Sequence, residues 1–278
     1  MEMYFFLKVF SLYLRNAPTF AYKITYKIIY SLLFHVLKMR QKTVLTNLRW
    51  AFPDKNEEWY KNTMKQCYKF FTKEFLDFIS FPKNYSSSKI KFKNLEVLSS
   101  AHVMKKGIIL VGSHYGSFDK LFYALSQEEY NLTGVAYKQN NSGADIFFKQ
   151  IRENFMEDQL YKGGDVKQLK NSLVKNNILI LLSDQDAKKK GVKAKFFGID
   201  SSTHSGAAIL SKRNKSPIIY ASITSKNNIY EVEFVKINTS GSINDIVQQY
   251  TSEIEKTIIN NPEQYFWFHK RWKSVKAY

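Results

Sequence analysis

This sequence of 278 residues contains a single cysteine, Cys67. One cysteine excludes an internal disulfide and any cysteine-rich metal site, and we expect Cys67 to be a small buried residue. The five histidines are too scattered to suggest a metal site, and no glycine-rich phosphate loop is present. We therefore expect neither a metal nor another cofactor.

The sequence also lacks a long apolar run. A membrane-spanning helix needs about 20 mostly apolar residues, and the longest clean run here is 28–37. No cleavage site typical of a signal peptide follows the N-terminal residues. We expect residues 1–52 to form a helical, membrane-associated segment, and residues 1–37 to lie as one or two helices in or against the membrane interface, kept on the cytoplasmic side by their positive charge. A poorly scoring spanning helix and a soluble helical layer remain alternatives.

Acidic residues are scarce relative to basic ones. There are 42 Lys and Arg residues against 24 Asp and Glu residues, which gives a net charge of +18. Such a charge favours nucleic acid, anionic lipid head groups or an acidic protein as partners. Tyrosine and lysine interleave in 4–8 and 22–30, as is usual at a membrane interface. We find no recognisable nucleic-acid-binding module and expect no nucleic-acid partner.

Apolar runs and helical patterns alternate after residue 53. This order predicts an α/β domain over 53–278 with a mostly parallel central sheet flanked by helices. A basic loop is expected at 188–195. Strands are expected at 107–112, 132–137, 178–183, 217–223 and 229–235, and helices at 57–80, 117–127, 145–155, 166–175, 206–213 and 243–260.

His114 lies in the turn between the expected strand 107–112 and the helix that follows, and Asp119 comes five positions later. A histidine in such a loop can fold back so that one ring nitrogen meets a carboxylate in the first helical turn. The other nitrogen is then free to accept a proton from a substrate hydroxyl. The spacing alone is weak and fits a turn histidine with a helix-capping Asp at least as well. The position between a buried strand and a helix supports the other interpretation, in which His114 is a general base and Asp119 orients it.

Several segments resemble the bacterial lipid A biosynthesis acyltransferases, the lauroyl and myristoyl transferases of the wider lysophospholipid acyltransferase superfamily. The first is Gly112-Ser-His-Tyr-Gly-Ser-Phe-Asp119. The others, in order, are 46–53, Ser183-Asp-Gln-Asp186 with Phe196-Phe-Gly198, the Thr203 to Gly206 step, and the C-terminal 262–273, which is the most specific match.

The resemblance implies a glycerolphosphate-acyltransferase-like fold. It also implies transfer of a fatty acyl group from acyl carrier protein to a hydroxyl of a lipid A-type glycolipid in the membrane, with His114 and Asp119 catalytic. Two positions depart from the family pattern, which often has Glu at the place of Asp119 and Arg at the place of Lys138. Lysine keeps the charge but loses the bidentate fork of arginine. Another lipid acceptor, a lysophospholipid or an aminolipid, is an alternative, as are a nucleic-acid-binding protein and an inactive membrane scaffold.

Further residues are candidates for substrate binding. Asp184 is either a turn former or a site wall that contacts sugar hydroxyls. The lysines of 188–195 are either a solvated loop or contacts to lipid phosphate or to the carrier protein, and the two phenylalanines are either core or acyl-pocket lining. His204 is expected to be a loop or helix-entry residue. The full set is Lys138, Arg152, Asp184, Gln185, Lys188, Lys190, Phe196 and Phe197.

Overall fold

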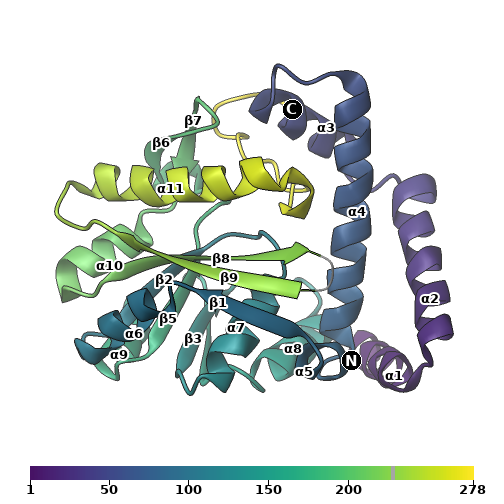
Figure 1. Ribbon diagram of the computed structural model, residues 1–278, viewed down its shortest axis with the longest axis horizontal. Helices are drawn as coiled ribbons and strands as arrows, with labels where there is room; N and C mark the ends of the chain where they lie inside the picture. The colour runs from purple at the N-terminus through teal and green to yellow at the C-terminus, as the bar shows by residue number, and fades with distance from the viewer. Residues whose placement is uncertain (227–228) are drawn as a thin grey trace.

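In the computed structural model, seven strands form one sheet with helices on both of its faces (Figure 1). The structure describes residues 1–226 and 229–278. The strand order is β1-β9-β8-β2-β5-β3-β4, and every neighbouring pair is parallel except β8 with β9. The mostly parallel α/β fold predicted from the sequence is confirmed. The strands are β1 (Lys89–Lys93), β2 (Ile108–Gly112), β3 (Leu132–Ala136), β4 (Asp158–Tyr161), β5 (Ile178–Leu182), β8 (Ile218–Lys226) and β9 (Ile229–Ile237).

The central strand β2 is buried along its whole length because helices cover both of its faces. Ile109 and Val111 pack in one core cluster with α10 (Gly206–Asn214) and α11 (Ile243–Asn260). Ile108 and Leu110 pack in the other cluster. That second cluster includes side chains of α6 (Leu95–Val103), α7 (Phe118–Gln127) and α8 (Ser142–Arg152), while α9 (Val166–Val174) contributes Leu173 to the first.

The N-terminal helices lie beside α4 (Glu57–Ile79), on the side away from the sheet (Figure 1). They are α1 (Glu2–Asn16), α2 (Thr19–Ser31) and the short π-helix η1 (Leu32–Val36). The described part of the chain has 24 exposed large hydrophobic side chains, and 14 of them belong to residues 1–39. Within the described residues, no helix is both long and apolar enough to cross a membrane.

The third N-terminal helix, α3 (Gln41–Ala51), packs differently because its apolar side chains are buried. Val44 and Leu48 belong to the same core cluster as Tyr220 of β8 and Trp267 near the C-terminus. The Asn47 amide donates hydrogen bonds to the carbonyls of Trp267 (2.7 Å) and His269 (2.8 Å). This helix therefore ties the C-terminal segment to the N-terminal region.

The structure corrects the expected basic loop at 188–195. Only Lys188–Lys190 form an exposed turn, a 3-10 helix, and the chain then enters an antiparallel hairpin of β6 (Val192–Phe196) and β7 (Ile199–Thr203). Alternate lysines of β6 point outward, where Lys193 and Lys195 pair with Asp200 (2.7 and 3.4 Å), while Ala194 and Phe196 are buried. The short helices α5 (Lys83–Ser86) and η3 (Pro262–Gln264) complete the chain.

Candidate active site

His114 and Asp184 lie side by side because they follow neighbouring parallel strands at the same distance. In the register of β2 with β5, Gly112 is opposite Leu182, and each of the two residues comes two positions later. His114 Nδ1 is 2.9 Å from Asp184 Oδ1. The imidazole is 27% exposed and the carboxylate only 2%. The other ring nitrogen, Nε2, is not engaged by Asp184, and the imidazole is partly exposed.

The surroundings of the imidazole fix its orientation and its charge. Phe266 N–H donates to the His114 carbonyl (2.9 Å), the Phe118 ring lies edge-on to the imidazole (5.4 Å between centroids), and the Gln185 amide nitrogen is within 3.5 Å of both ring nitrogens. Burial lowers the pKa of His114, but the Asp184 charge and hydrogen bond outweigh burial and raise it overall. Burial raises the pKa of Asp184, and His114 lowers it overall. Asp184 is therefore ionised, and Nδ1 donates the hydrogen bond.

Asp119 does not make the predicted hydrogen bond to His114. Its carboxylate instead faces the Arg152 guanidinium, with 4.0 Å between Oδ1 and Nε. Burial raises the pKa of Asp119, against the lowering influence of Arg152 and His114. The partner of Nδ1 is thus Asp184, because the strand register brings that carboxylate closer than the first turn of α7 does. Asp119 remains within the electrostatic reach of the imidazole.

Two cavities meet at His114. The larger, of about 710 Å³, is lined by side chains of β3, β4 and β5 and by the start of α10. The smaller, of about 490 Å³, is walled mainly by aromatic side chains of α4 and of the C-terminal segment, such as Phe71, Phe75 and Phe268. Both are also lined by His114, Phe118, Asp119, Gln139, Arg152 and Phe266. His114 therefore lines both a cavity of mixed polarity and a more apolar one.

The structure brings some of the predicted substrate-binding residues to this junction and leaves others elsewhere. Arg152 lines both cavities, Gln185 lines the larger one, and Asp184 contacts the histidine. Lys138, Lys188 and Lys190 line neither cavity.

Phe196 and Phe197 also lie away from both cavities, so the acyl-pocket alternative for them is not supported. Phe196 is 1% exposed and packs on Trp272 (5.6 Å between centroids), and Phe197 packs on Phe52 (5.1 Å). Both belong to the core around α3 and the C-terminus.

Sequence reasoning missed the role of Asp184 as the histidine's partner and the lining contributed by α4. Asp184 could have been found, because both residues follow buried parallel strands and such strands present their carboxyl ends at one edge. The contribution of α4 follows only from tertiary packing.

A match along nearly the whole chain shows to which family it belongs. The model of the bacterial lipid A biosynthesis acyltransferase family matches residues 2–274. The chain belongs to this family. Two segments that carry the family resemblance meet at the site: Gly116 N–H donates to Gln264 O (2.8 Å), and Tyr115 bridges to Tyr265. The C-terminal segment of this family member therefore holds the loop that carries His114.

Curated relatives in the same family are distant. The chain is 24% identical over 190 residues to the lipid A biosynthesis palmitoleoyltransferase of Escherichia coli (strain K12) and to a lipid A biosynthesis acyltransferase of Shigella flexneri. The match covers 66% of this chain and 61% of the length of each relative.

Proposed function

We propose that this family member transfers a fatty acyl group from an acyl thioester to a hydroxyl group of a lipid A-type glycolipid, with His114 as the general base. The observation that carries this proposal is the His114–Asp184 pair at the junction of an apolar cavity and a larger one that also has polar and charged side chains in its lining. An acyl chain and a hydrophilic acceptor must meet at the reacting atom, and this junction offers a place for each. Family membership supports the same reaction.

The proposed reaction uses both ring nitrogens of His114. The Nδ1 proton stays on the imidazole and remains hydrogen-bonded to Asp184, which fixes the tautomer. Nε2 takes the proton of the acceptor hydroxyl. The hydroxyl oxygen attacks the thioester carbonyl carbon and forms a tetrahedral intermediate. This intermediate collapses with cleavage of the C–S bond, and the imidazolium returns its proton to the thiolate. The products are the acyl ester and the free thiol of the donor.

Arg152 and Asp119 have supporting roles in this proposal. Arg152 places a positive charge beside the reacting centre, where negative charge develops on the thioester oxygen. Asp119 faces both this guanidinium and the imidazole, so it favours the imidazolium that forms during the reaction. Asp119 is thus proposed as an electrostatic partner, and Asp184 as the orienting one.

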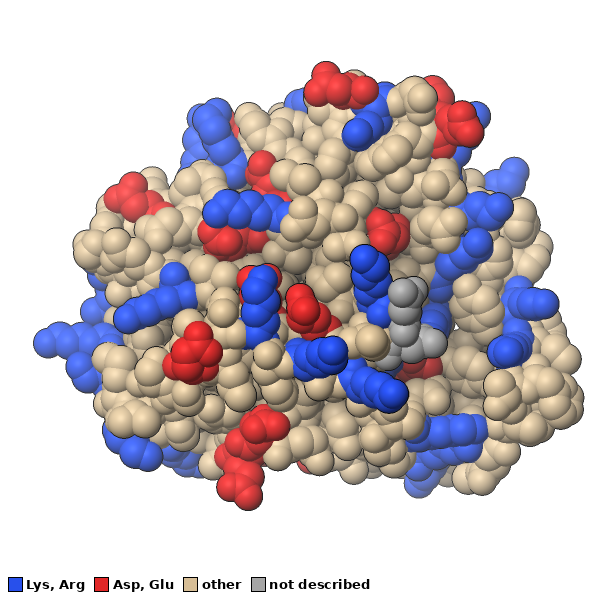
Figure 2. All heavy atoms as spheres, in the orientation of Figure 1, with Lys and Arg blue, Asp and Glu red and all other residues tan. Residues whose placement is uncertain are grey.

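We assign the acyl chain to the smaller cavity, because its walls are mostly aromatic and aliphatic. Acyl carrier protein is the proposed donor, since an acidic carrier complements a chain of charge +18. Basic side chains are scattered over the face drawn in Figure 2, with acidic ones among them. A lysophospholipid or an aminolipid remains the alternative acceptor.

The proposed location is the cytoplasmic face of the bacterial inner membrane. The exposed apolar side chains of α1, α2 and η1 are suited to the interface, and exposed Lys8, Arg15, Lys23 and Lys27 are suited to anionic head groups. Leu33 and Met39, which line the apolar cavity, belong to this same N-terminal region.

The decisive test is the loss of the base. We expect His114→Ala to lower kcat by about 10²–10⁴-fold, the range typical of general-base catalysis. Transfer to a phosphorylated glycolipid and to a lysophospholipid would be followed by mass spectrometry, with circular dichroism as the control for folding. A folded His114→Ala protein with near-normal turnover would overturn the mechanism, and faster use of the lysophospholipid would overturn the assigned acceptor.

A further inference from the structure

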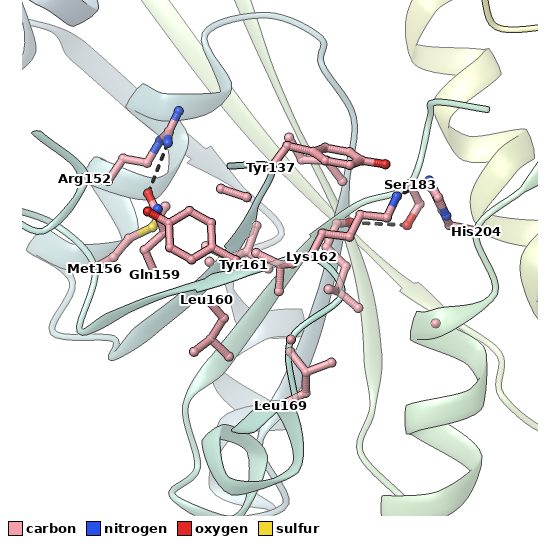
Figure 3. Close-up of a pocket in the computed structure, with 18 of the residues that line it drawn as sticks. Tyr137, Arg152, Met156, Gln159, Leu160, Tyr161, Lys162, Leu169, Ser183 and His204 are labelled. Carbon is pink, nitrogen blue, oxygen red and sulfur yellow. Dashed lines mark hydrogen bonds between the residues drawn. The ribbon is translucent and has the colours of Figure 1, made fainter. Parts of the chain in front are cut away.

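The larger cavity contains a group of residues that the proposed mechanism does not use (Figure 3). They lie where β4 and the start of α10 form its wall. Lys162 follows β4, and its Nζ is 3.0 Å from Nε2 of His204, which precedes α10. The same ammonium lies over the Tyr137 ring, 4.5 Å from its centroid. All three residues line the cavity that contains His114.

The positive charge of this group is not neutralised by an ion pair within the described residues, although Asp184 and Asp186 act on His204 electrostatically. Lys162 pairs with no carboxylate in the part of the chain that the structure describes, and its contact with His204 joins two nitrogens. Asp165 also lines the cavity, but its carboxylate caps α9 by accepting from Lys167 N–H (2.8 Å). A lysine whose nearest polar contact is a histidine has ammonium protons left for an anion.

The start of α10 adds partial positive charge to the same wall of the cavity. Gly206 and Ala207 line the cavity, and the N-cap residue Ser205 makes no side-chain cap. The first backbone N–H groups of a helix have no partner within the helix and carry partial positive charge. They are therefore further donors on the same wall as His204.

Buried Arg271 supplies a third source of positive charge. It is 1% exposed and donates to Thr203 Oγ1 (2.7 Å), next to His204, while its Nε has no hydrogen-bond partner among residues 1–226 and 229–278. Burial, Lys162 and Arg271 lower the pKa of His204 to about 4, against the raising influence of Asp184 and Asp186. At neutral pH His204 is therefore uncharged and can donate one ring N–H.

We propose that Lys162, His204 and the first turn of α10 form a subsite for a phosphate group of a substrate whose reacting atom lies at His114. The inference rests on the proposed function, because it places the phosphate and the reacting atom in one cavity. A phosphate suits this wall since it can accept several hydrogen bonds and carries up to two charges. Two sources share this chemistry: a phosphate on the acceptor's sugar head group and the phosphodiester of a carrier-bound pantetheine donor.

The first experiment measures binding without catalysis. Inorganic phosphate would be titrated into the full-length protein while the His204 resonances are followed by NMR. We expect saturable binding and a rise in the pKa of His204, because a bound anion favours its protonated form. Lys162→Gln should weaken phosphate binding at least about tenfold, since it removes a charge-assisted hydrogen bond.

Two controls make this result specific. Lys149→Gln changes an exposed lysine of α8 that pairs with Glu153, and it should leave phosphate binding unchanged. His114→Ala should also keep phosphate binding, so that a failure of the acyl-transfer mechanism does not count against the subsite. Unsaturable binding, or equal binding by Lys162→Gln and the wild-type protein, would overturn the proposal.

The second experiment distinguishes the two sources of phosphate. If the acceptor supplies it, Lys162→Gln raises KM for a phosphorylated glycolipid about tenfold and has little effect with the dephosphorylated one. If the donor supplies it, the same variant raises KM for acyl carrier protein and has little effect with an acyl thioester of phosphate-free pantetheine. An equal effect on substrates with and without the phosphate would exclude a phosphate subsite.

Discussion

At the scale of single residues, the pKa of His114 links the structure to a measurable pH dependence. Asp184 raises this pKa above its usual value of about 6.5. A general base must be unprotonated, so kcat/KM should rise with pH as His114 loses its proton, with the midpoint above 6.5. Asp184→Asn removes the charge that favours the imidazolium. We therefore expect its acid limb to move to lower pH while the maximal rate falls.

The matched variant is Asp119→Asn. In the wild-type protein the Asp119 carboxylate makes no hydrogen bond to the imidazole, and it raises the pKa of His114 less than Asp184 does. The acid limb should consequently move less than in Asp184→Asn. A larger shift in Asp119→Asn would show that Asp119 is the orienting partner, as the sequence spacing alone predicts.

At the scale of elements, α7 connects the site to a buried ionic cluster. Asp119 faces the cavities, while the next residue, Lys120, is 1% exposed and its Nζ lies 2.7 Å from Asp77 Oδ2 and 3.3 Å from Glu74 Oε2, both on α4. Tyr230 of β9 accepts from the same ammonium at 2.9 Å. This cluster fixes α7 against α4, and hence fixes the wall shared by the two cavities.

Removing the buried ammonium should therefore destabilise the protein. Lys120→Met leaves two carboxylates with less compensation, and breaking a buried pair typically costs about 3–5 kcal/mol. We expect about 3 kcal/mol, because Lys73 remains 2.8 Å from Asp77. The control Lys149→Met breaks an exposed pair and should cost no more than about 0.5 kcal/mol. Urea unfolding checks both values, and equal costs would contradict the cluster's structural importance.

The same scale shows which parts of the molecule can be predicted from sequence. The bounds of β2 can be predicted from its apolar run, and those of α11 from its helical pattern. The start of α11 is well defined because Ser242 and Asp245 form a capping box. Strand β1 escapes prediction because lysines alternate along this edge strand and its exposed positions dominate the pattern. The His114–Asp184 pair needs the register of two strands 70 residues apart, whereas local spacing favours Asp119.

At the scale of the whole molecule, the net charge of +18 should make kcat/KM for an acidic donor depend on salt concentration. Complementary charges raise the association rate and are screened by salt. We expect kcat/KM for acyl carrier protein to fall steeply between about 0.01 and 0.2 M salt, and acyl-CoA to be the less efficient donor. Replacing Lys188, Lys189 and Lys190 with Glu should raise KM for the carrier and leave kcat largely unchanged. A flat salt response would assign the charge to the membrane surface instead.

The N-terminal surface should decide where the molecule resides. Val9 and Ile28 are 68% and 62% exposed on α1 and α2, whereas Val103 and Val174 are 76% and 73% exposed at the ends of α6 and α9. If α1 and α2 insert into the interface, the double variant Val9→Asp, Ile28→Asp should reduce sedimentation with anionic vesicles at least about tenfold, because two apolar side chains lose their burial in lipid. The double variant Val103→Asp, Val174→Asp adds the same charge and should sediment like the wild-type protein.

High salt should release the wild-type protein only partly, since apolar burial is not screened. Equal sedimentation of the two double variants, or complete release by salt, would show that electrostatic attraction alone holds this protein to the membrane.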